Sequence, residues 1–362
     1  MLRTISIGMV AVLALAAMVA TAGAAELKQG SPELKSAGPI CFGPEGILFV
    51  ADSRAATITA IDTGDKGLES SGPLAVEAIN EKIAALLGAT AENILITDMA
   101  VHPTSKQVYL SVSRGRGPDA APALLRVDAA GKIQEVPLDN VKYDQAKLPN
   151  PPADSGTGRR NQRGESITDL AYVDGRLLIA GLSNEEFASK LRSLPYPFEG
   201  ADAGTSVEIF HGAHGRFETA SPVRTFVPYE IAGEPHLLAA YTCTPLVKFP
   251  LSELQTGAKV MGTTVAELGN RNRPLDMIVY QQDGKDFLLI ANSSRGIMKV
   301  TTEGVDIDEG ITERINGTAG VKYDTVEELK GVVQLDSFDD AHAVVLVQNE
   351  DGAIDLRTIA LP

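Results

Sequence analysis

One pattern of short apolar strands recurs six times along this chain of 362 residues. Each copy has an apolar strand, a tight turn, a second and more apolar strand ending in a small residue, a polar turn and a third strand. The first copy runs from Gly38 to Asp62 and the fifth from Asp276 to Thr301. The others begin at Asp98, Asp169, Thr225 and Gln334.

Such a unit cannot bury both of its own faces. The second strand is apolar on both sides, as in a strand sandwiched between neighbouring sheets, and the Asp-Gly and Gly-Pro turns suit antiparallel reversals. Radial stacking buries the faces and leaves only short edges. We therefore predict an all-β fold, a six-bladed β-propeller with seven blades as the alternative, formed by residues 25–362 as one domain.

Ring closure requires a strand from elsewhere in the chain. The sixth copy ends after its third strand, because the sequence stops at Pro362. The segment Glu26 to Leu34 has no other predicted partner. We predict that this segment supplies the fourth strand of the sixth blade.

The repeats resemble those of the NHL, SMP-30-like and YncE-like propellers. The resemblance is carried by the stretch from Phe42 to Ser53 and then by Asp276 to Val300, and it implies the propeller fold. Similarity to SMP-30-like lactonases would imply a divalent metal held by Glu, Asn and Asp from different blades. Asp52, Asn184 and Asn292 stand near such positions, without a residue-by-residue match.

The first 24 residues have the features of a signal peptide. Arg3 is followed by an apolar run from Ile5 to Ala20, and Ala22 and Ala24 place small residues at a cleavage site. The run is short for a membrane span, which leaves an uncleaved anchor as the alternative. We predict a periplasmic or secreted protein with no membrane span after cleavage.

The charge balance restricts the partners. The chain has 47 acidic and 32 basic side chains and a formal net charge of −15, which disfavours nucleic-acid binding. It has no Trp, which excludes WD40 repeats and the Trp-bearing repeats of quinoprotein dehydrogenases. The remaining partners are an unidentified protein or small molecule.

Three stretches interrupt the repeats. Leu74 to Leu87 has its apolar residues on one helical face, with Gly88 placed to end the helix, so we predict one short inserted helix. Asn140 to Glu165 and Asn184 to Gly204 read as long insertions. All three map to the same face of a propeller, which we take as the functional, loop-rich face.

A column of carboxylates stands at the start of the predicted innermost strands, at Asp98, Asp169 and Asp276. Carboxylates that converge on a channel repel one another unless a cation lies among them, and calcium-like ions prefer such oxygen ligands. The alternative is structural, since Asp in this position also accepts backbone N–H bonds. A divalent, calcium-like cation is therefore the cofactor hypothesis.

Polar residues after the second strands and near the insertions are the candidates for ligand binding. They are Asp52, Arg54, Arg114, Asn184, Arg224, Asn292 and Arg295. Our first hypothesis is a propeller that binds a partner protein or small ligand on this face, without evident catalysis. The alternatives are a metal-dependent hydrolase or lactonase at the channel mouth, and a purely structural role. Whether the protein is an enzyme stays open.

The histidines and cysteines predict no soft-metal site. His211 and His214 are separated by glycine and alanine, which favours a turn that keeps the imidazoles apart and leaves them without a third ligand. Cys41 and Cys243 belong to the first and fourth copies, which are opposite in a six-membered ring. We predict two free thiols.

Overall fold

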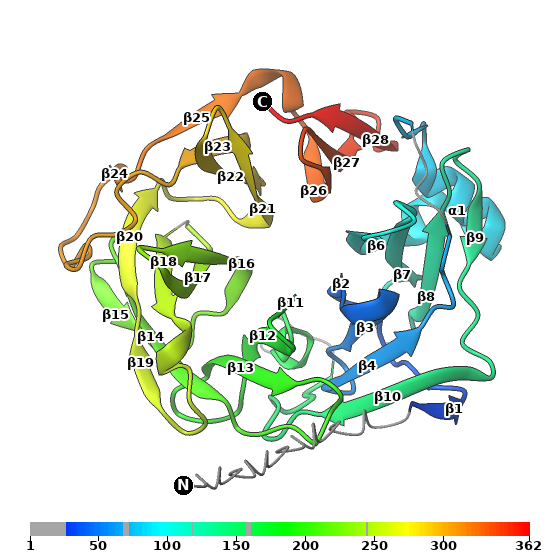
Figure 1. Ribbon diagram of the computed structural model, residues 1–362, viewed down its shortest axis with the longest axis horizontal. Helices are drawn as coiled ribbons and strands as arrows, with labels where there is room; N and C mark the ends of the chain where they lie inside the picture. Colours follow the sequence, from blue (N-terminus) through cyan, green and yellow to red (C-terminus); the bar gives the residue numbers. More distant parts are fainter. Residues whose placement is uncertain (1–26, 68–71, 118, 157–160, 244) are drawn as a thin grey trace, which may run out of the picture.

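The computed structural model describes residues 27–67, 72–117, 119–156, 161–243 and 245–362. Six mainly antiparallel sheets surround a central channel, as Figure 1 shows, so the chain is an all-β, six-bladed propeller. The predicted signal peptide lies outside the described residues. No helix within them has the length and apolar character to cross a membrane.

The first three blades follow the first three copies of the repeat, with strands given from the channel outward. Blade 1 contains β2 (Ile40–Phe42), β3 (Ile47–Asp52), β4 (Thr57–Asp62), β10 (Val141–Lys147) and β1 (Lys28–Gly30). Blade 2 contains β6 (Ile94–Val101), β7 (Val108–Arg114), β8 (Ala121–Val127) and β9 (Ile133–Glu135). Blade 3 contains β11 (Asp169–Val173), β12 (Arg176–Leu182), β13 (Ser189–Pro195), β14 (Thr205–His211) and β15 (Arg216–Glu218), with β19 (Lys259–Met261) parallel to β14.

The other three blades follow the last three copies. Blade 4 contains β16 (Val223–Ile231), β17 (Glu234–Tyr241), β18 (Pro245–Pro250), β20 (Thr263–Leu268) and β24 (Thr318–Gly320). Blade 5 contains β21 (Pro274–Gln282), β22 (Lys285–Asn292), β23 (Gly296–Thr301) and β25 (Tyr323–Val326). Blade 6 contains β26 (Val332–Asp339), β27 (His342–Gln348), β28 (Ile354–Ala360) and β5 (Ala75–Val76).

The blades are not arranged in chain order. Apolar clusters join blade 2 to blade 6, blade 2 to blade 1, and blade 1 to blade 3, and further clusters join blades 3, 4, 5 and 6 in sequence. The contacts between innermost strands give the same circle. The order around the channel is therefore 2, 1, 3, 4, 5, 6, which can be followed in Figure 1.

Two long excursions of the chain produce this order. After β4 the chain reaches blade 6, where β5 pairs with β28, and α1 (Ile79–Leu87) packs Ile79 and Ile83 into the cluster between blades 6 and 2. After blade 2 the chain returns to blade 1, where β10 pairs with β4. The first excursion attaches β5 to blade 6, two places from blade 1, and the second returns the chain to blade 1, beside which blade 3 then forms.

The prediction that the segment Glu26 to Leu34 supplies the fourth strand of blade 6 is therefore wrong. The outer strand of blade 6 is β5, whereas β1 pairs with β10 on blade 1. The reason is local, because Asp52 accepts hydrogen bonds from the Lys35 N–H and from the Ser36 hydroxyl at 2.7 Å. These bonds hold the N-terminal segment on blade 1.

The predicted helix is confirmed over Ile79–Leu87 as α1 and ends at Gly88, but its predicted start is wrong, because Ala75–Val76 pair with β28 as β5. The two insertions were also misread. Residues 141–147 form β10, and residues 189–195 form β13, the third strand of blade 3. The sequence of β13 contains Lys190 and Arg192, which are buried here, so it lacks the apolar signal of a strand. Only the parts outside these strands are loops.

Candidate functional site

The innermost strands all begin at one face of the ring, which we call the front face. Three aspartates stand near these starts, Asp98 on β6, Asp169 on β11 and Asp276 on β21. They belong to blades 2, 3 and 5. In the observed ring order these are alternate blades, which separates the three charges as widely as six blades allow.

Each of these carboxylates joins its blade to the next one. The N–H groups of Ile40, Phe226 and Leu335, each on the following blade, donate to the three aspartates at 2.7, 2.7 and 2.9 Å. Leu170 and Met277 donate to Asp169 and Asp276 from the same strand, both at 2.8 Å. These bonds match the structural role that the sequence left open, while the cation at this site stays a prediction.

A fourth carboxylate lies deeper in the channel. Asp336 on β26 accepts an N–H from Val101 at 2.7 Å and another from Ser337 at 2.7 Å. In blade 6 the position that corresponds to the other three aspartates is held by Gln334, and the N–H of the next residue, Leu335, donates to Asp276. Asp336 lies two residues beyond Gln334. This offset explains why the sequence column did not include it.

Burial makes these carboxyl groups hard to ionise. It raises the pKa of Asp169 to about 7 and that of Asp336 to about 6. Burial, with repulsion from the neighbouring aspartates, raises the pKa of Asp98 and Asp276 well above the usual range. The thiol of Cys41 on β2 has its pKa raised by burial and by Asp169. The part of the channel that contains these four aspartates therefore carries less negative charge than the number of carboxyl groups suggests.

The front half of the channel is a cavity of about 600 Å³, which we call the vestibule. Its floor includes Asp98, Asp169 and Asp276, and its wall carries the guanidinium groups of Arg54, Arg224 and Arg273. The rear half, about 500 Å³, shares these three aspartates and is lined in addition by Asp336, Cys41 and mostly apolar residues of the inner strands. Positive charge is thus confined to the front.

The three arginines differ in how they are held. Arg224 donates to Glu165 at 2.8 Å and to the Thr242 hydroxyl at 3.1 Å. Arg273 has its pKa lowered by burial and then by the positive charge of Arg224. The guanidinium groups of Arg54 and Arg273 donate no hydrogen bond to any described residue. They remain available to a ligand.

The other predicted ligand-binding residues do not enter the vestibule. Asp52 and Asn292 are buried and occupied by local hydrogen bonds, Asp52 with the segment 35–36 and Asn292 with Asn272 at 2.9 Å. Arg114 donates to the Leu87 carbonyl at 3.1 Å, and Arg295 donates to the Asn270 carbonyl at 3.2 Å. Asn184 is exposed, and its N–H donates to the Asn150 carbonyl.

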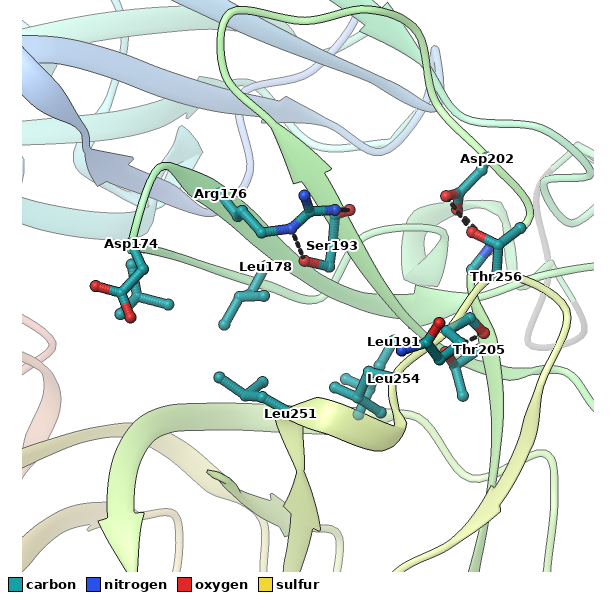
Figure 2. A pocket seen from close by; sticks show the side chains of 13 residues that line it. Asp174, Arg176, Leu178, Leu191, Ser193, Asp202, Thr205, Leu251, Leu254 and Thr256 are labelled. Atoms are coloured by element: carbon teal, nitrogen blue, oxygen red, sulfur yellow. Dashed lines mark hydrogen bonds between the residues drawn. The ribbon is translucent and has the colours of Figure 1, made fainter. Parts of the chain in front are cut away.

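Another cavity opens between blades 3 and 4 at the opposite, rear face, and Figure 2 shows its lining. Its volume is about 440 Å³. Arg176 donates to the Ser193 hydroxyl at 2.6 Å, and the Thr256 hydroxyl donates to Asp202, so these polar groups are already paired. Leu178 and Leu251 form part of an apolar wall. The vestibule is the stronger candidate because the guanidinium groups of two of its arginines, Arg54 and Arg273, have no hydrogen-bond partner among the described residues.

The structure also corrects the prediction for the histidines. The N–H groups of His214 and Gly215 donate to the His211 carbonyl at 3.0 and 2.8 Å, which makes the segment one helix-like turn. The turn places the imidazole rings of His211 and His214 3.8 Å apart between centroids. The side chain of Cys243 from blade 4 lies beside them, so a third potential ligand is present, contrary to the prediction.

Both cysteines are free, as predicted, but not for the reason predicted. In the observed order, blades 1 and 4 are separated only by blade 3. Cys41 faces the rear chamber, whereas Cys243 lies in the turn after β17. The two thiols are apart because one lies in the channel and the other in a turn, and not because their blades are opposite in the ring.

Comparison with known proteins identifies no family. No family model and no curated protein matches the chain. Among solved structures, a PQQ-bound aldose sugar dehydrogenase from Streptomyces coelicolor is 11% identical over 92% of this chain and 97% of that chain, with a TM-score of 0.38. The extracellular domains 1-2 of Drosophila semaphorin 1b are 10% identical over 93% and 87%, with a TM-score of 0.41. These likenesses are too distant to bear on activity.

Proposed function

We propose that this protein is an exported propeller that binds a small anionic molecule, such as a carboxylate or phosphate compound, in the vestibule. The observation that carries the proposal is the pair of unpartnered guanidinium groups, Arg54 and Arg273, in the wall of a cavity of about 600 Å³. Ligand cavities commonly measure about 300–1,000 Å³. Export rests on the predicted signal peptide, and the proposal is for binding without a reaction step.

The electrostatics of the vestibule support an anion rather than a cation. Arg224 and Arg273 repel each other, and Glu165 offsets that repulsion only in part. The aspartates below are engaged with backbone N–H groups, and their raised pKa values reduce their charge near neutral pH. A carboxylate or phosphate group would satisfy the arginines by charge-assisted hydrogen bonds.

We expect Arg273→Gln to weaken anion binding by about ten- to a hundredfold, since a hydrogen bond to a charged group contributes about 1.5–3 kcal/mol. Calorimetric titration of the full chain with phosphate, citrate and glucuronate would measure this effect at low ionic strength. Neutral glucose is the comparison ligand.

The matched control is Arg176→Gln. Arg176 lies in the rear cavity and already donates to Ser193, so its loss leaves the vestibule intact. Equal effects of the two substitutions would contradict the proposal, as would the absence of binding by all three anions. Calcium binding that depends on Asp169 would instead favour the metal-dependent alternative.

A further inference from the structure

Two histidines and one cysteine from adjacent blades meet on the front face. His211 ends β14 and His214 lies in the following turn, both on blade 3, while Cys243 follows β17 on blade 4. One ligand atom from each side chain lies within 4.8 Å of the others. Within the described part of the chain, no other group of three His, Cys, Asp or Glu side chains is arranged in this way.

Glu218 on β15 orients both imidazoles. Its carboxylate lies 3.0 Å from Nδ1 of His211 and 2.7 Å from Nδ1 of His214, and it also accepts bonds from Arg216 and Ser221. A carboxylate whose oxygens receive four such contacts acts as a hydrogen-bond acceptor. This contact assigns the ring hydrogen to Nδ1 of both histidines and leaves their Nε2 atoms as the nitrogens that can bind an ion.

The Nε2 atom of His211 has no partner in the described protein. His211 is only 2% exposed, and this atom is inaccessible to solvent. Leaving a buried polar atom without a hydrogen-bond partner destabilises the folded state. A purely structural role for the two histidines does not explain why this nitrogen is buried without a partner. An ion bound to Nε2 would supply the missing partner.

Cys243 is held in a conformation that few side chains adopt. Its φ of 64° lies in the left-handed region, which is unfavourable for an L-residue, and its N–H donates to the Asn272 carbonyl at 2.8 Å. Glycine or asparagine would suit this turn better. Strained positions of this kind concentrate at functional sites.

We propose that His211, His214 and Cys243 bind a transition-metal ion, and that the ion is copper. Two imidazoles and one thiolate are the ligands of trigonal copper centres, and sites of given donors bind Cu²⁺ more tightly than Zn²⁺. A carboxylate that accepts the second ring N–H of metal-bound histidines is a usual supporting feature. His214 is partly exposed, so an ion could reach the site from solvent.

The metal site adjoins the vestibule but does not depend on its ligand. Thr242, the neighbour of Cys243, accepts a hydrogen bond from Arg224, and Asn272 precedes Arg273 in the chain. An ion bound by Cys243 would therefore influence the positions of Thr242 and Asn272, and through them those of Arg224 and Arg273.

The test is a titration of the full chain, reduced, stripped of metal and purified without a histidine tag. Cu⁺, Cu²⁺ and Zn²⁺ are added separately under argon, followed by dialysis and elemental analysis. We expect one copper per chain, with a thiolate-to-copper absorption band for Cu²⁺. Cys243→Ser should abolish the band and weaken binding at least a hundredfold. Glu218→Gln should weaken binding about ten- to a hundredfold.

Cys41→Ser is the matched control and should bind copper like the unaltered chain. His214→Gln, which changes a partly exposed side chain, tests the site if Cys243→Ser does not fold, and circular dichroism checks each variant. The proposal is overturned if the unaltered chain binds none of the three ions stoichiometrically, or if Cys41→Ser loses as much binding as Cys243→Ser. Tighter binding of Zn²⁺ than of either copper ion would overturn the assignment to copper.

Discussion

Replacing Phe49 with alanine is expected to lower the free energy of unfolding by about 3–5 kcal/mol, the usual cost of removing a buried phenylalanine. Phe49 lies on β3 and is fully buried. Its ring contacts Tyr172, Tyr196 and Phe198 at centroid distances of 5.7, 4.9 and 5.9 Å. All three partners follow blade 2 in the chain and belong to blade 3. Chemical denaturation measures the change.

Phe217→Ala is the matched control. Phe217 is 49% exposed on β15, so its removal should cost less than about 1 kcal/mol. A double-mutant cycle between Phe49 and Tyr172 should give a coupling energy of about 0.5–1.5 kcal/mol for the stacked pair. A coupling of zero would contradict the order 2, 1, 3, since blades placed in chain order would separate these two rings.

The blades were predictable because each copy of the repeat is local. An apolar second strand between two tight turns specifies its hairpins within about 25 residues, and six such units require a ring. The order of the blades was not predictable in the same way. It depends on where β5 and β10 pair, and β5 has only two residues, with no pattern that distinguishes blade 6 from blade 1.

The candidate site was predictable to a similar extent. Asp98, Asp169 and Asp276 occupy matching positions in the repeat, and Arg54 and Arg224 reach the vestibule. Arg273 lies in a connection between blades, where the repeat gives no alignment. The His211, His214 and Cys243 cluster depends on two turns of different blades, and glycine content alone could not show that the first turn is helical.

The second large effect concerns pH. Asp169 has an ordinary pKa of 3.8 when unfolded and about 7 in the folded chain. The folded state therefore binds the proton more tightly, and the contribution of Asp169 to stability is present below pH 4 and lost as the pH rises through 7. The full shift corresponds to at most about 4 kcal/mol, and because Asp169 is only half-buried, solvent screening reduces this to about 1–3 kcal/mol.

Asp169→Asn should therefore shrink the loss of unfolding free energy between pH 5 and pH 8 by about 1–3 kcal/mol relative to the unaltered chain. Urea denaturation at both pH values measures this difference. The repulsion that Asp169 exerts on Asp98 and Asp276 disappears in the same variant, which changes the slope in the same direction.

Asp174→Asn is the control, because Asp174 is an exposed residue of the β11–β12 turn with a φ of 49°, a conformation that asparagine tolerates. It should keep the pH dependence of the unaltered chain. If Asp169→Asn also kept it, the carboxylate would have to be ionised and compensated in the folded state. A cation among Asp98, Asp169 and Asp276 would provide that compensation, so the same measurement distinguishes a ring of carboxylates that joins blades from one that binds metal.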